Sequence, residues 1–442
     1  MGAEGMNTQK HVIKMGLLGL GTVGTGVLQL VQNNRVDLMG KTGVEFRFTK
    51  ALVRDALKER PGVEQFKKEG LEITTNPSHI VDDPDIDIVV EVLGGIPTAK
   101  SCITKALQNG KYVVTANKDL LAQHGQELFA LAKRQERSIH YEASVGGGIP
   151  LISPLKNCLV ANRIQSLLGI VNGTTNYILT QMTLEEKDFA LALAEAQAQG
   201  FAEQEPSSDL DGRDAAFKLT ILASLAFSSI VDVQEVYTES IREISVRDIM
   251  YAKQLGFVLK VLAIGEETPQ GLVLRVHPTL IPEDHPLAAV HNEFNALFVT
   301  GDAVGEVMFY GRGAGSLPTA SAVVADIIEV VRNIKYQVKS GSIETTYKAK
   351  PVIPIKEQKS RFYLRLKAID RSGVFGSVAT ALGNEGVSLD LIIQNQREAG
   401  VAEIVLVTHT TLEERFYAAL ENIQKLGSIR NVSNVIRVLE RG

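Results

Sequence analysis

The chain has 442 residues, of which 45% are hydrophobic and 22% are charged, and its formal net charge is −5. A chain of this length exceeds what one hydrophobic core usually supports, so we expect two or three domains. The mildly acidic balance and the lack of a long Lys or Arg block argue against nucleic acid as a partner. The longest apolar run, residues 215–231, is too short and too rich in Ser and Thr to span a bilayer, so no membrane association is expected.

The two cysteines indicate neither a disulfide framework nor a zinc site. Cys102 and Cys158 stand alone in the sequence, without Cys or His neighbours at metal-ligand spacing. Such a chain suits a reducing compartment, and we expect a cytoplasmic protein that acts on small molecules.

Strands and helices alternate over residues 1–150. An apolar strand at 12–19 runs into the stretch "GLGTVG", which is followed by a helical pattern. Further strands with helices between them are expected at 44–53, 87–95, 111–117 and 138–144. This alternation predicts an α/β fold with a parallel sheet, that is, a Rossmann dinucleotide-binding domain.

The rest of the chain divides into two further domains. Longer helices and scattered strands predict an α+β domain over 151–318, and a helix near 319–335 is expected to return to the first domain. Residues 336–360 are polar and contain prolines, which is typical of a linker. Residues 361–442 follow the order β-α-β-β-α-β of a ferredoxin-like unit.

The glycines of "GLGTVG" fit the pattern GxGxxG between a strand and a helix. This pattern allows a tight turn and brings a pyrophosphate close to the N-terminus of the helix. We therefore expect cofactor contacts along this stretch, from Gly19, Leu20, Gly21, Thr22, Val23 and Gly24.

The second strand ends in "LVRDALKER" instead of an acid that would bind the ribose 2′-hydroxyl group. Arg54, with Lys58 nearby, can meet a 2′-phosphate, which favours NADP over NAD. In the alternative interpretation Arg54 is a solvated loop residue and Asp55 binds the ribose.

A single lysine, Lys218, interrupts the uncharged run from Ala215 to Val231. Asp214 precedes it by four residues and shares its helical face, with Asp211 expected one turn earlier. A helix that is apolar nearly all round is buried, so the ammonium group is expected in the interior or in a cleft. There it is poised as a proton donor, whereas the alternative is a structural pair whose lysine stem reaches out to solvent.

Other polar residues are candidates for the same site. Lys118 follows the strand at 111–117, at the carboxyl edge where open α/β sheets bind ligands, although ordinary surface lysines also occur at helix starts. Glu203 and Asp209 lie on the loop before the buried helix and can bind a cationic group. The exit "EASVGGGIP", residues 142–150, holds a monovalent cation, faces an anion, or is a plain turn.

Six stretches resemble homoserine dehydrogenases over about the first 335 residues. In chain order they are "GLGTVG", "TANK", "EASVGGGIP", "GIVNGTTNYIL", "AQAQGFAEQEPSSDLDGRDAAFKL" and "GRGAGSLPTASAVVAD". The tail "DRSGVFGSVATALGNEGVSLDLIIQN" resembles an ACT domain. The resemblance implies NAD(P)-dependent interconversion of L-homoserine and L-aspartate 4-semialdehyde, in the biosynthesis of threonine, methionine and isoleucine.

The resemblance also implies roles for individual residues. Lys218 would donate and accept the proton at the C4 oxygen, Asp214 would orient it, and Lys118 would lie between nicotinamide and substrate. Glu203 would hold the α-amino group and Asp209 would line the same pocket. A late cofactor contact is implied for Gly315, and a sodium site for the carbonyls of Glu142, Val145, Gly147 and Ile149.

For the ACT domain, the resemblance implies an amino-acid effector such as threonine, acting as a feedback inhibitor. Gly373, Val374 and Gln394 match positions that usually frame the effector pocket. A pure dimerisation module is the alternative, because ferredoxin-like edges also favour pairing. A homodimer or homotetramer is expected.

The chain departs from the family pattern at Gln204-Glu205-Pro206, where Pro-Asp-Pro usually follows the glutamate, and this change bears on substrate affinity. Two other functions compete. An enzyme like aspartate-semialdehyde dehydrogenase would need an activated cysteine, for which neither Cys102 nor Cys158 has a suitable setting. A sensor that binds dinucleotide and amino acid without catalysis would leave Lys218 unexplained.

Overall fold

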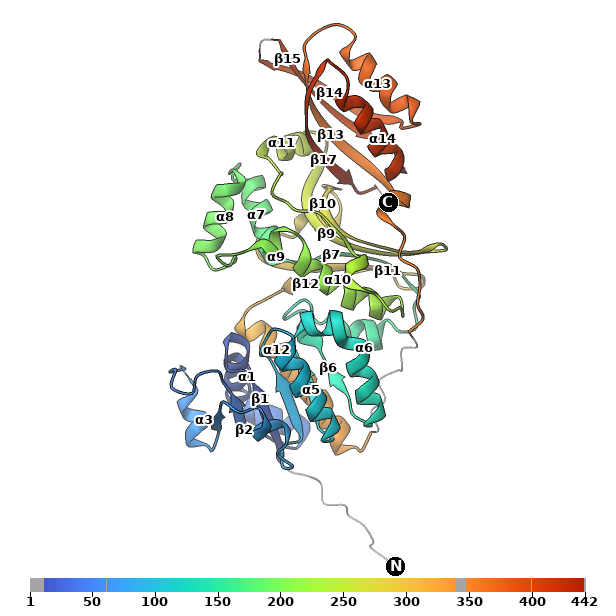
Figure 1. The fold of residues 1–442 in the computed structure, drawn as a ribbon. Coiled ribbons are helices and arrows are strands. Elements are labelled where there is room, and N and C mark those ends of the chain that lie inside the picture. The colour runs from blue at the N-terminus through green and yellow to red at the C-terminus, as the bar shows by residue number, and fades with distance from the viewer. Residues whose placement is uncertain (1–11, 61, 339–346, 399, 441–442) are drawn as a thin grey trace, which may run out of the picture.

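The structure, a computed structural model, describes residues 12–60, 62–338, 347–398 and 400–440. Figure 1 shows three parts stacked along the molecule, with the N-terminal sheet at one end and the C-terminal strands at the other. Across these described ranges, no helix is both long enough and apolar enough to cross a membrane.

The N-terminal part contains a six-stranded parallel sheet in the order β3-β2-β1-β4-β5-β6, as predicted for a Rossmann domain. Its strands are β1 (Val12–Leu18), β2 (Glu45–Leu52), β3 (Glu72–Thr74), β4 (Ile88–Glu91), β5 (Tyr112–Thr115) and β6 (Ile139–His140). Its helices are α1 (Thr22–Asn33), α2 (Arg35–Thr42), α3 (Glu64–Lys68), α4 (Ser78–Val81), α5 (Pro97–Gln108) and α6 (Lys118–Arg134). The sequence pattern does not predict β3, whose three residues are too few for a periodic signal.

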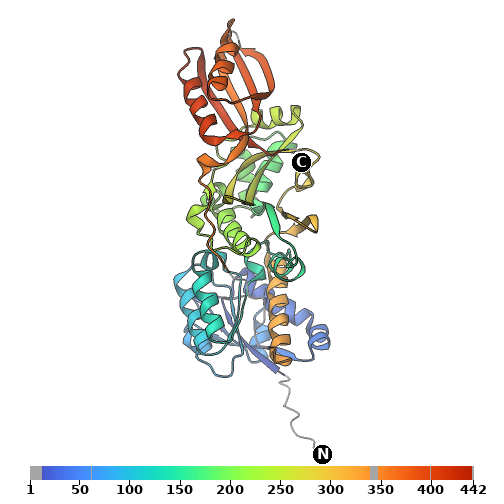
Figure 2. The same cartoon turned by 90° about the vertical axis from the view of Figure 1, so that its right-hand side faces the viewer.

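Different helices cover the two faces of this sheet. Apolar residues of α4, α5 and α6 pack on one face, and those of α1, α2 and α12 (Ser316–Lys335) pack on the other. Figure 2 shows α12, in orange, beside the N-terminal elements although it comes from far along the chain. Lys335 Nζ donates to the carbonyl of Thr42 at 2.9 Å, so α12 completes the N-terminal part.

The middle part packs helices on a mostly antiparallel sheet. Its strands are β7 (Ile164–Ile170), β8 (Tyr237–Thr238), β9 (Phe257–Thr268), β10 (Gly271–Pro282), β11 (Phe294–Gly301) and β12 (Gly305–Arg312). Its α-helices are α7 (Gly173–Leu184), α8 (Phe189–Ala198), α9 (Ser207–Leu210), α10 (Arg213–Ala226) and α11 (Val246–Gln254). Short helical turns are η1 (Glu142–Ser144), η2 (Pro154–Cys158), η3 (Val233–Glu235) and η4 (Pro286–Ala289). The predicted α+β architecture is therefore present.

The C-terminal part has the predicted ferredoxin-like order. After η5 (Ile355–Glu357) it consists of β13 (Lys359–Ile369), α13 (Val374–Asn384), β14 (Leu389–Glu398), β15 (Val401–Thr408), β16 (Thr411–Leu412), α14 (Glu413–Gln424) and β17 (Ile429–Val438). Strand β17 also pairs in parallel with β10, which joins the two sheets into one of 11 strands. The sequence pattern does not reveal this join, because only two residue pairs form it and they are far apart in the sequence.

The part of the predicted linker that begins at residue 347 is attached to the middle part. Leu272 N donates to Pro351 O and Ile353 N donates to Leu272 O, each at 2.8 Å. The segment therefore runs along the first residues of β10 on its way to β13. Residues 339–346 lie outside the described part of the chain.

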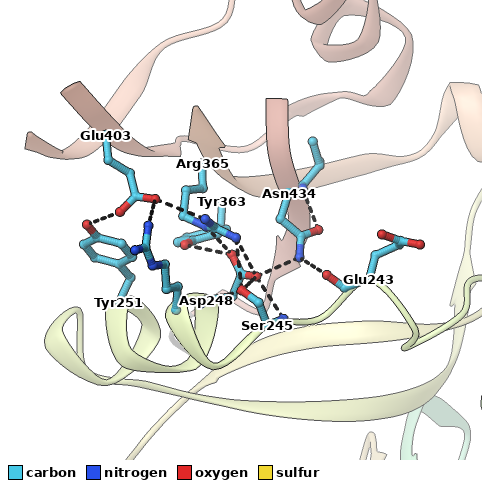
Figure 3. Close-up of polar contacts among 10 residues, drawn as sticks. Glu243, Ser245, Asp248, Tyr251, Tyr363, Arg365, Glu403 and Asn434 are labelled. Carbon is cyan, nitrogen blue, oxygen red and sulfur yellow. Dashed lines mark hydrogen bonds and ion pairs between the residues drawn. The ribbon is translucent and has the colours of Figure 1, made fainter. Parts of the chain in front are cut away.

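A buried ion cluster holds the C-terminal sheet against α11 (Figure 3). Arg365 on β13 donates through Nε to Asp248 Oδ1 at 2.7 Å and through Nη1 to Glu403 Oε1 at 3.1 Å. Tyr251 completes the cluster by donating its hydroxyl to Glu403 Oε2 at 2.7 Å. Asp248 is fully buried and Arg365 is only 5% exposed, so neither charge can be satisfied by water. Removal of one partner of such a pair leaves an uncompensated buried charge.

We expect Arg365→Met to lower the free energy of unfolding by about 3–5 kcal/mol, because Asp248 would stay fully buried without its cation. Unfolding by urea, followed by circular dichroism, measures this change. The control is Arg35→Met, which breaks a pair with Glu45 whose arginine is 50% exposed and which should cost less than about 1 kcal/mol. Equal destabilisation by the two variants would contradict the structural role of the cluster.

Candidate active site

Asp214 and Lys218 lie on one face of α10, as the sequence predicts. Lys218 Nζ donates to Asp214 Oδ2 at 2.7 Å and to the carbonyl of Val171 at 2.6 Å. The lysine side chain is 13% exposed and the aspartate side chain 10%. The lysine therefore points inward, and the alternative of a stem that reaches out to solvent is wrong.

The expected place of Asp211 is wrong. Gly212 has φ 78°, in the left-handed region, and caps the N-terminus of α10, so Asp211 lies outside that helix at the end of α9. Its carboxylate accepts hydrogen bonds from Arg242 Nε at 3.0 Å and from Ser240 Oγ at 3.1 Å. The hydrogen bond from Arg242 lowers the pKa of Asp211. Asp211 therefore faces away from the Asp214–Lys218 pair.

A second ammonium group reaches Asp214 from the N-terminal part. Lys118, the first residue of α6, places Nζ 3.3 Å from Asp214 Oδ1. Burial would raise the pKa of Asp214, but the charges of Lys218 and Lys118 lower it to about 2. Burial would likewise lower the pKa of Lys118, but Asp214 and Asp119 raise it. One carboxylate therefore lies between two ammonium groups at the boundary of two parts of the molecule.

Asn172 organises this site although the residue pattern does not single it out. Its Oδ1 caps α7 by accepting from Thr175 N at 2.9 Å, which orients the amide. Its Nδ2 then donates to Asp209 Oδ1 at 2.7 Å and to Asp214 Oδ2 at 2.8 Å. The available signal was an Asn directly before a helical pattern, but that signal predicts only the cap.

Asp209 joins the same network from α9, a short helix where a loop was expected. Besides the amide of Asn172, the hydroxyl of Thr174 donates to Asp209 Oδ2 at 3.1 Å. Burial raises the pKa of Asp209, although the hydrogen bonds from Asn172 and Thr174 act to lower it. The carboxylate is thus held in place next to the pair of Asp214 and Lys218.

Glu203 lies apart from this network, on the exposed loop between α8 and α9. Its side chain makes no ion pair or hydrogen bond with any described residue, and Gln204 and Glu205 are exposed as well. Gln197 Nε2 donates to the carbonyls of Glu203 and Gln204 at 3.0 and 3.3 Å. These two bonds brace the backbone at the point where the chain departs from the family pattern.

The glycine turn lies where β1 ends and α1 begins. A Cβ atom at Gly24 would collide with the carbonyl of Gly19, so this close approach requires glycine. In the described part of the chain no atom lies within 4 Å of the Cβ position at Gly21, so the outer side of the turn is open. Leu20 is buried, whereas Thr22 is exposed and its carbonyl accepts from Ser316 Oγ at 2.7 Å.

Two other predicted cofactor contacts lie beside this turn. Gly315 is the N-cap of α12, one residue before Ser316, and is therefore close to the turn. Arg54 and Lys58 are exposed and follow the end of β2, whose Leu52 carbonyl accepts from Gly19 N at 3.1 Å. Asp55 is exposed too, and its carboxylate accepts from Leu57 N at 2.8 Å.

A buried carboxylate, Glu91, connects two loops beside Lys118, and the residue pattern does not single it out. It accepts from Thr115 Oγ1 at 2.6 Å and from Leu93 N at 2.9 Å at the carboxyl ends of β4 and β5. Burial raises the pKa of Glu91 and also that of the nearby thiol of Cys102, which Glu91 raises further. A thiol with a raised pKa is a poor nucleophile, which argues against Cys102 as a catalytic nucleophile.

The stretch "EASVGGGIP" forms a turn around the side chain of Glu142. This carboxylate accepts the backbone N–H groups of Leu151, Ile152 and Ser153 at 2.6, 2.8 and 2.7 Å. The carbonyls of Val145, Gly147 and Ile149 accept no hydrogen bond from any described residue.

The predicted effector residues lie on two elements of the C-terminal part. Gly373 caps α13 and Val374 begins it, with a buried side chain. Gln394 lies on β14, which is separated from β13 by β15, and its side chain is exposed. Within the described residues, no hydrogen bond joins Gln394 to the start of α13.

Three family models match the chain in succession. The model for the NAD-binding domain of homoserine dehydrogenase matches residues 19–142, and the model for homoserine dehydrogenase matches residues 150–328. The ACT domain model matches residues 362–428.

Homoserine dehydrogenases of other organisms are similar to the chain over most of its length. Homoserine dehydrogenase of Synechocystis sp. is 45% identical over 438 residues, covering 97% of this chain and 99% of the relative, and that of Bacillus subtilis is 43% identical with the same coverage. The crystal structure of a homoserine dehydrogenase from Thiobacillus denitrificans is 41% identical, with a TM-score of 0.91 over 97% of this chain and 98% of that one. A hyperthermophilic archaeal homoserine dehydrogenase in complex with NADPH is 27% identical, with a TM-score of 0.60 over 72% of this chain and 97% of that one. The chain therefore belongs to the homoserine dehydrogenase family, with the NAD-binding domain at its N-terminus and an ACT domain at its C-terminus.

Proposed function

We propose that Lys218 transfers the proton in the NAD(P)-dependent interconversion of L-homoserine and L-aspartate 4-semialdehyde. The observation that carries this proposal is the position of Asp214 between two ammonium groups. Lys218 comes from the middle part and Lys118 from the carboxyl edge of the NAD-binding sheet. At this edge, open α/β sheets bind their ligands. The shared carboxylate therefore brings a proton donor next to the cofactor-binding edge.

The residues of the glycine turn fit a dinucleotide. The turn is open on its outer side at Gly21, and the N-terminus of α1 is free to face a pyrophosphate. Arg54 is exposed just past β2 and is available for a 2′-phosphate, which supports NADP as the preferred coenzyme. The relative solved with NADPH supports the same choice.

The chemistry follows from the charges of the site. When bound, the nicotinamide supplies the hydride to C4 of the semialdehyde, or accepts it from homoserine. The ammonium group of Lys218 stabilises the negative charge that grows on the C4 oxygen and then gives it a proton. In the oxidation, the amine of Lys218 takes the hydroxyl proton. Asp214 stays ionised because its pKa is about 2, so it holds the nitrogen in place throughout.

Two carboxylates on the stretch between α8 and α10 are complementary to the ammonium group of an amino-acid substrate. We assign the α-ammonium group of the substrate to Glu203, whose exposed side chain makes no bond to a described residue, with Asp209 in the same pocket. Lys118 carries a charge because its pKa is raised, and it would lie between the nicotinamide and the substrate. Attraction between the carboxylates of Glu203 and Asp209 and the substrate's ammonium group then favours an amino acid over an uncharged alcohol.

A monovalent cation fits the turn of residues 142–150. Three carbonyls there have no hydrogen-bond donor among the described residues, and carbonyl oxygens are ligands for hard cations. We assign sodium to the carbonyls of Val145, Gly147 and Ile149 together with that of Glu142. The cation would stiffen the connection between the NAD-binding sheet and the middle part.

The ACT domain and the sheet edges support regulation and assembly. We assign an amino-acid effector, with threonine as the candidate, to the region of Gly373, Val374 and Gln394. Edge strands expose apolar side chains at both ends of the long sheet, with Tyr310 51% exposed on β12 and Ile392 46% exposed on β14. Such edges favour a homodimer or homotetramer. The free thiols of Cys102 and Cys158 suit a reducing compartment such as the cytoplasm.

We expect Lys218→Met to lower kcat for homoserine oxidation at least about 100-fold, because the proton acceptor at the C4 oxygen is lost. Binding of NADPH, measured by fluorescence titration, should be unchanged. The control Lys253→Met removes an exposed lysine of α11 and should leave kcat within twofold. A Lys218→Met enzyme with nearly normal kcat would exclude proton transfer by Lys218.

Arg54→Gln should raise the KM for NADP roughly tenfold and leave the KM for NAD unchanged, since only NADP carries the 2′-phosphate. Initial rates with each coenzyme test this. Arg47→Gln, on the exposed side of β2, is the matched control and should change neither KM. An equal change for both coenzymes would show that Arg54 does not contact the 2′-phosphate.

Sodium should raise the melting temperature by about 2 °C or more when NaCl replaces tetramethylammonium chloride at the same ionic strength, because a bound ion stabilises the folded state. Differential scanning calorimetry measures this shift without reference to activity. Identical melting temperatures in the two salts would exclude a sodium site.

A further inference from the structure

A short segment lies between the ACT domain and the substrate loop. We call Tyr237–Asp248 the bridging segment and residues 203–214 the substrate loop. The bridging segment begins with β8, which pairs with β10, and it ends in the first turn of α11. It therefore starts beside the join of β10 with β17 and ends at the ion cluster of Figure 3.

The ACT domain holds the bridging segment at its first residues through a buried arginine. Arg437 on β17 is 3% exposed and places Nη1 2.7 Å from Glu239 Oε1. The same guanidinium donates through Nε and Nη2 to both oxygens of Glu413, each at 2.6 Å, so its orientation is set by the ACT domain. Tyr237 also donates its hydroxyl to Glu239 Oε1, at 2.6 Å.

The ACT domain holds the end of the segment as well (Figure 3). Asn434 on β17 donates to the carbonyl of Glu243 at 3.1 Å, and Arg365 donates to Ser245 Oγ at 3.0 Å. Strands of the ACT sheet therefore fix the segment on both sides of residues 240–242.

Residues 240–242 in turn hold the substrate loop. Arg242 donates through Nε to Asp211 Oδ1 at 3.0 Å and through Nη2 to Ser207 Oγ at 3.3 Å. The backbone joins in, because Ile241 N donates to Leu210 O at 3.1 Å. These bonds hold α9, which carries Asp209, at its first residue, Ser207, and at its last, Leu210.

The bridging segment also packs against the start of α10. A Cβ atom at Gly212 would lie 3.5 Å both from the carbonyl oxygen of Glu239 and from Cβ of Thr238, so the bridging segment runs close beside Gly212. Gly212 lies two residues before Asp214. A shift of the bridging segment would therefore move α9 and Asp209 on it, whereas Asp214 is also held by Lys118, Lys218 and Asn172.

We propose that Arg242 is a positioning residue for homoserine, acting through Asp211, and that the ACT domain sets the position of the bridging segment through the Arg437–Glu239 pair. The proposal rests on the proposed function, because it assigns the substrate's ammonium group to the substrate loop. Contiguous packed groups of this kind carry coupling between distant sites. The expected consequence is a change in affinity for homoserine, since Lys218 and the glycine turn are not touched.

The first test is Arg242→Gln. We expect the KM for homoserine to rise about fivefold, while kcat stays within twofold and the KM for NADP is unchanged, because only the substrate loop is loosened. Arg242→Lys should restore most of the affinity, since a cation still reaches Asp211. The matched control is Arg163→Gln, which breaks an exposed pair with Glu267 elsewhere on the middle sheet and should change no parameter.

The second test is a double-mutant cycle of Arg242→Gln with Glu239→Gln, read as KM for homoserine. Both single variants should raise KM, and their effects should be non-additive because they lie on one path. Melting temperatures of the unchanged enzyme and the Glu239→Gln variant show whether the variant folds normally. The two should agree within about 2 °C, because the amide oxygen still accepts from Tyr237 and Arg437 keeps its buried ion pair with Glu413, so that only the charge of Glu239 is lost.

Several outcomes would overturn the proposal. An unchanged KM in Arg242→Gln, or a loss of kcat without a change in KM, would remove the positioning role. Additive effects, or no effect of Glu239→Gln, would remove the link to the ACT domain. Absence of homoserine oxidation in the unchanged enzyme would instead overturn the proposed function, and this inference with it.

Discussion

The carboxylate of Asp214 lies between the ammonium groups of Lys118 and Lys218, and the rest of the site depends on this contact. A buried carboxylate is costly unless it is paired, and here both of its oxygens face a cation. The lysines come from different parts of the chain, so the same interaction that satisfies the charge also sets the distance between the NAD-binding sheet and α10. The carboxylate of Asp214 is therefore needed both to compensate the buried charges and to keep the two lysines close together.

The fold supplies the surroundings of this contact in a few steps. Parallel strands place the glycine turn and Lys118 at one edge of the sheet, and α12 returns to pack beside α1 on one face of that sheet. The amide oxygen of Asn172 caps α7, and its amide nitrogen donates to Asp209 and Asp214. The cap of a helix therefore also orients two carboxylates of the site. The long sheet then continues through β10 and β17 into the ACT domain. The ACT domain is thus built onto the sheet on which α10 packs.

Local patterns predicted much of this arrangement, and long-range contacts account for what they missed. The spacing of Asp214 and Lys218 predicts their pairing because it depends on helix geometry alone. That Lys118 shares the same carboxylate could not be read from spacing, since the two residues are far apart in the sequence and only the packed fold joins them. Asp211 was misplaced because the left-handed turn at Gly212 starts a new helix where a continuous one was expected. The second role of Asn172 and the join of β10 with β17 likewise depend on tertiary contacts.

A crystal structure of the enzyme with NADP and L-homoserine would show directly which group Lys218 contacts when the substrate is bound. The account predicts that the substrate hydroxyl lies within about 3.2 Å of Lys218 Nζ, which stays bonded to Asp214, and that C4 faces the nicotinamide ring. A hydroxyl group that contacts only water or the side chain of another residue, with Lys218 turned away, would contradict it.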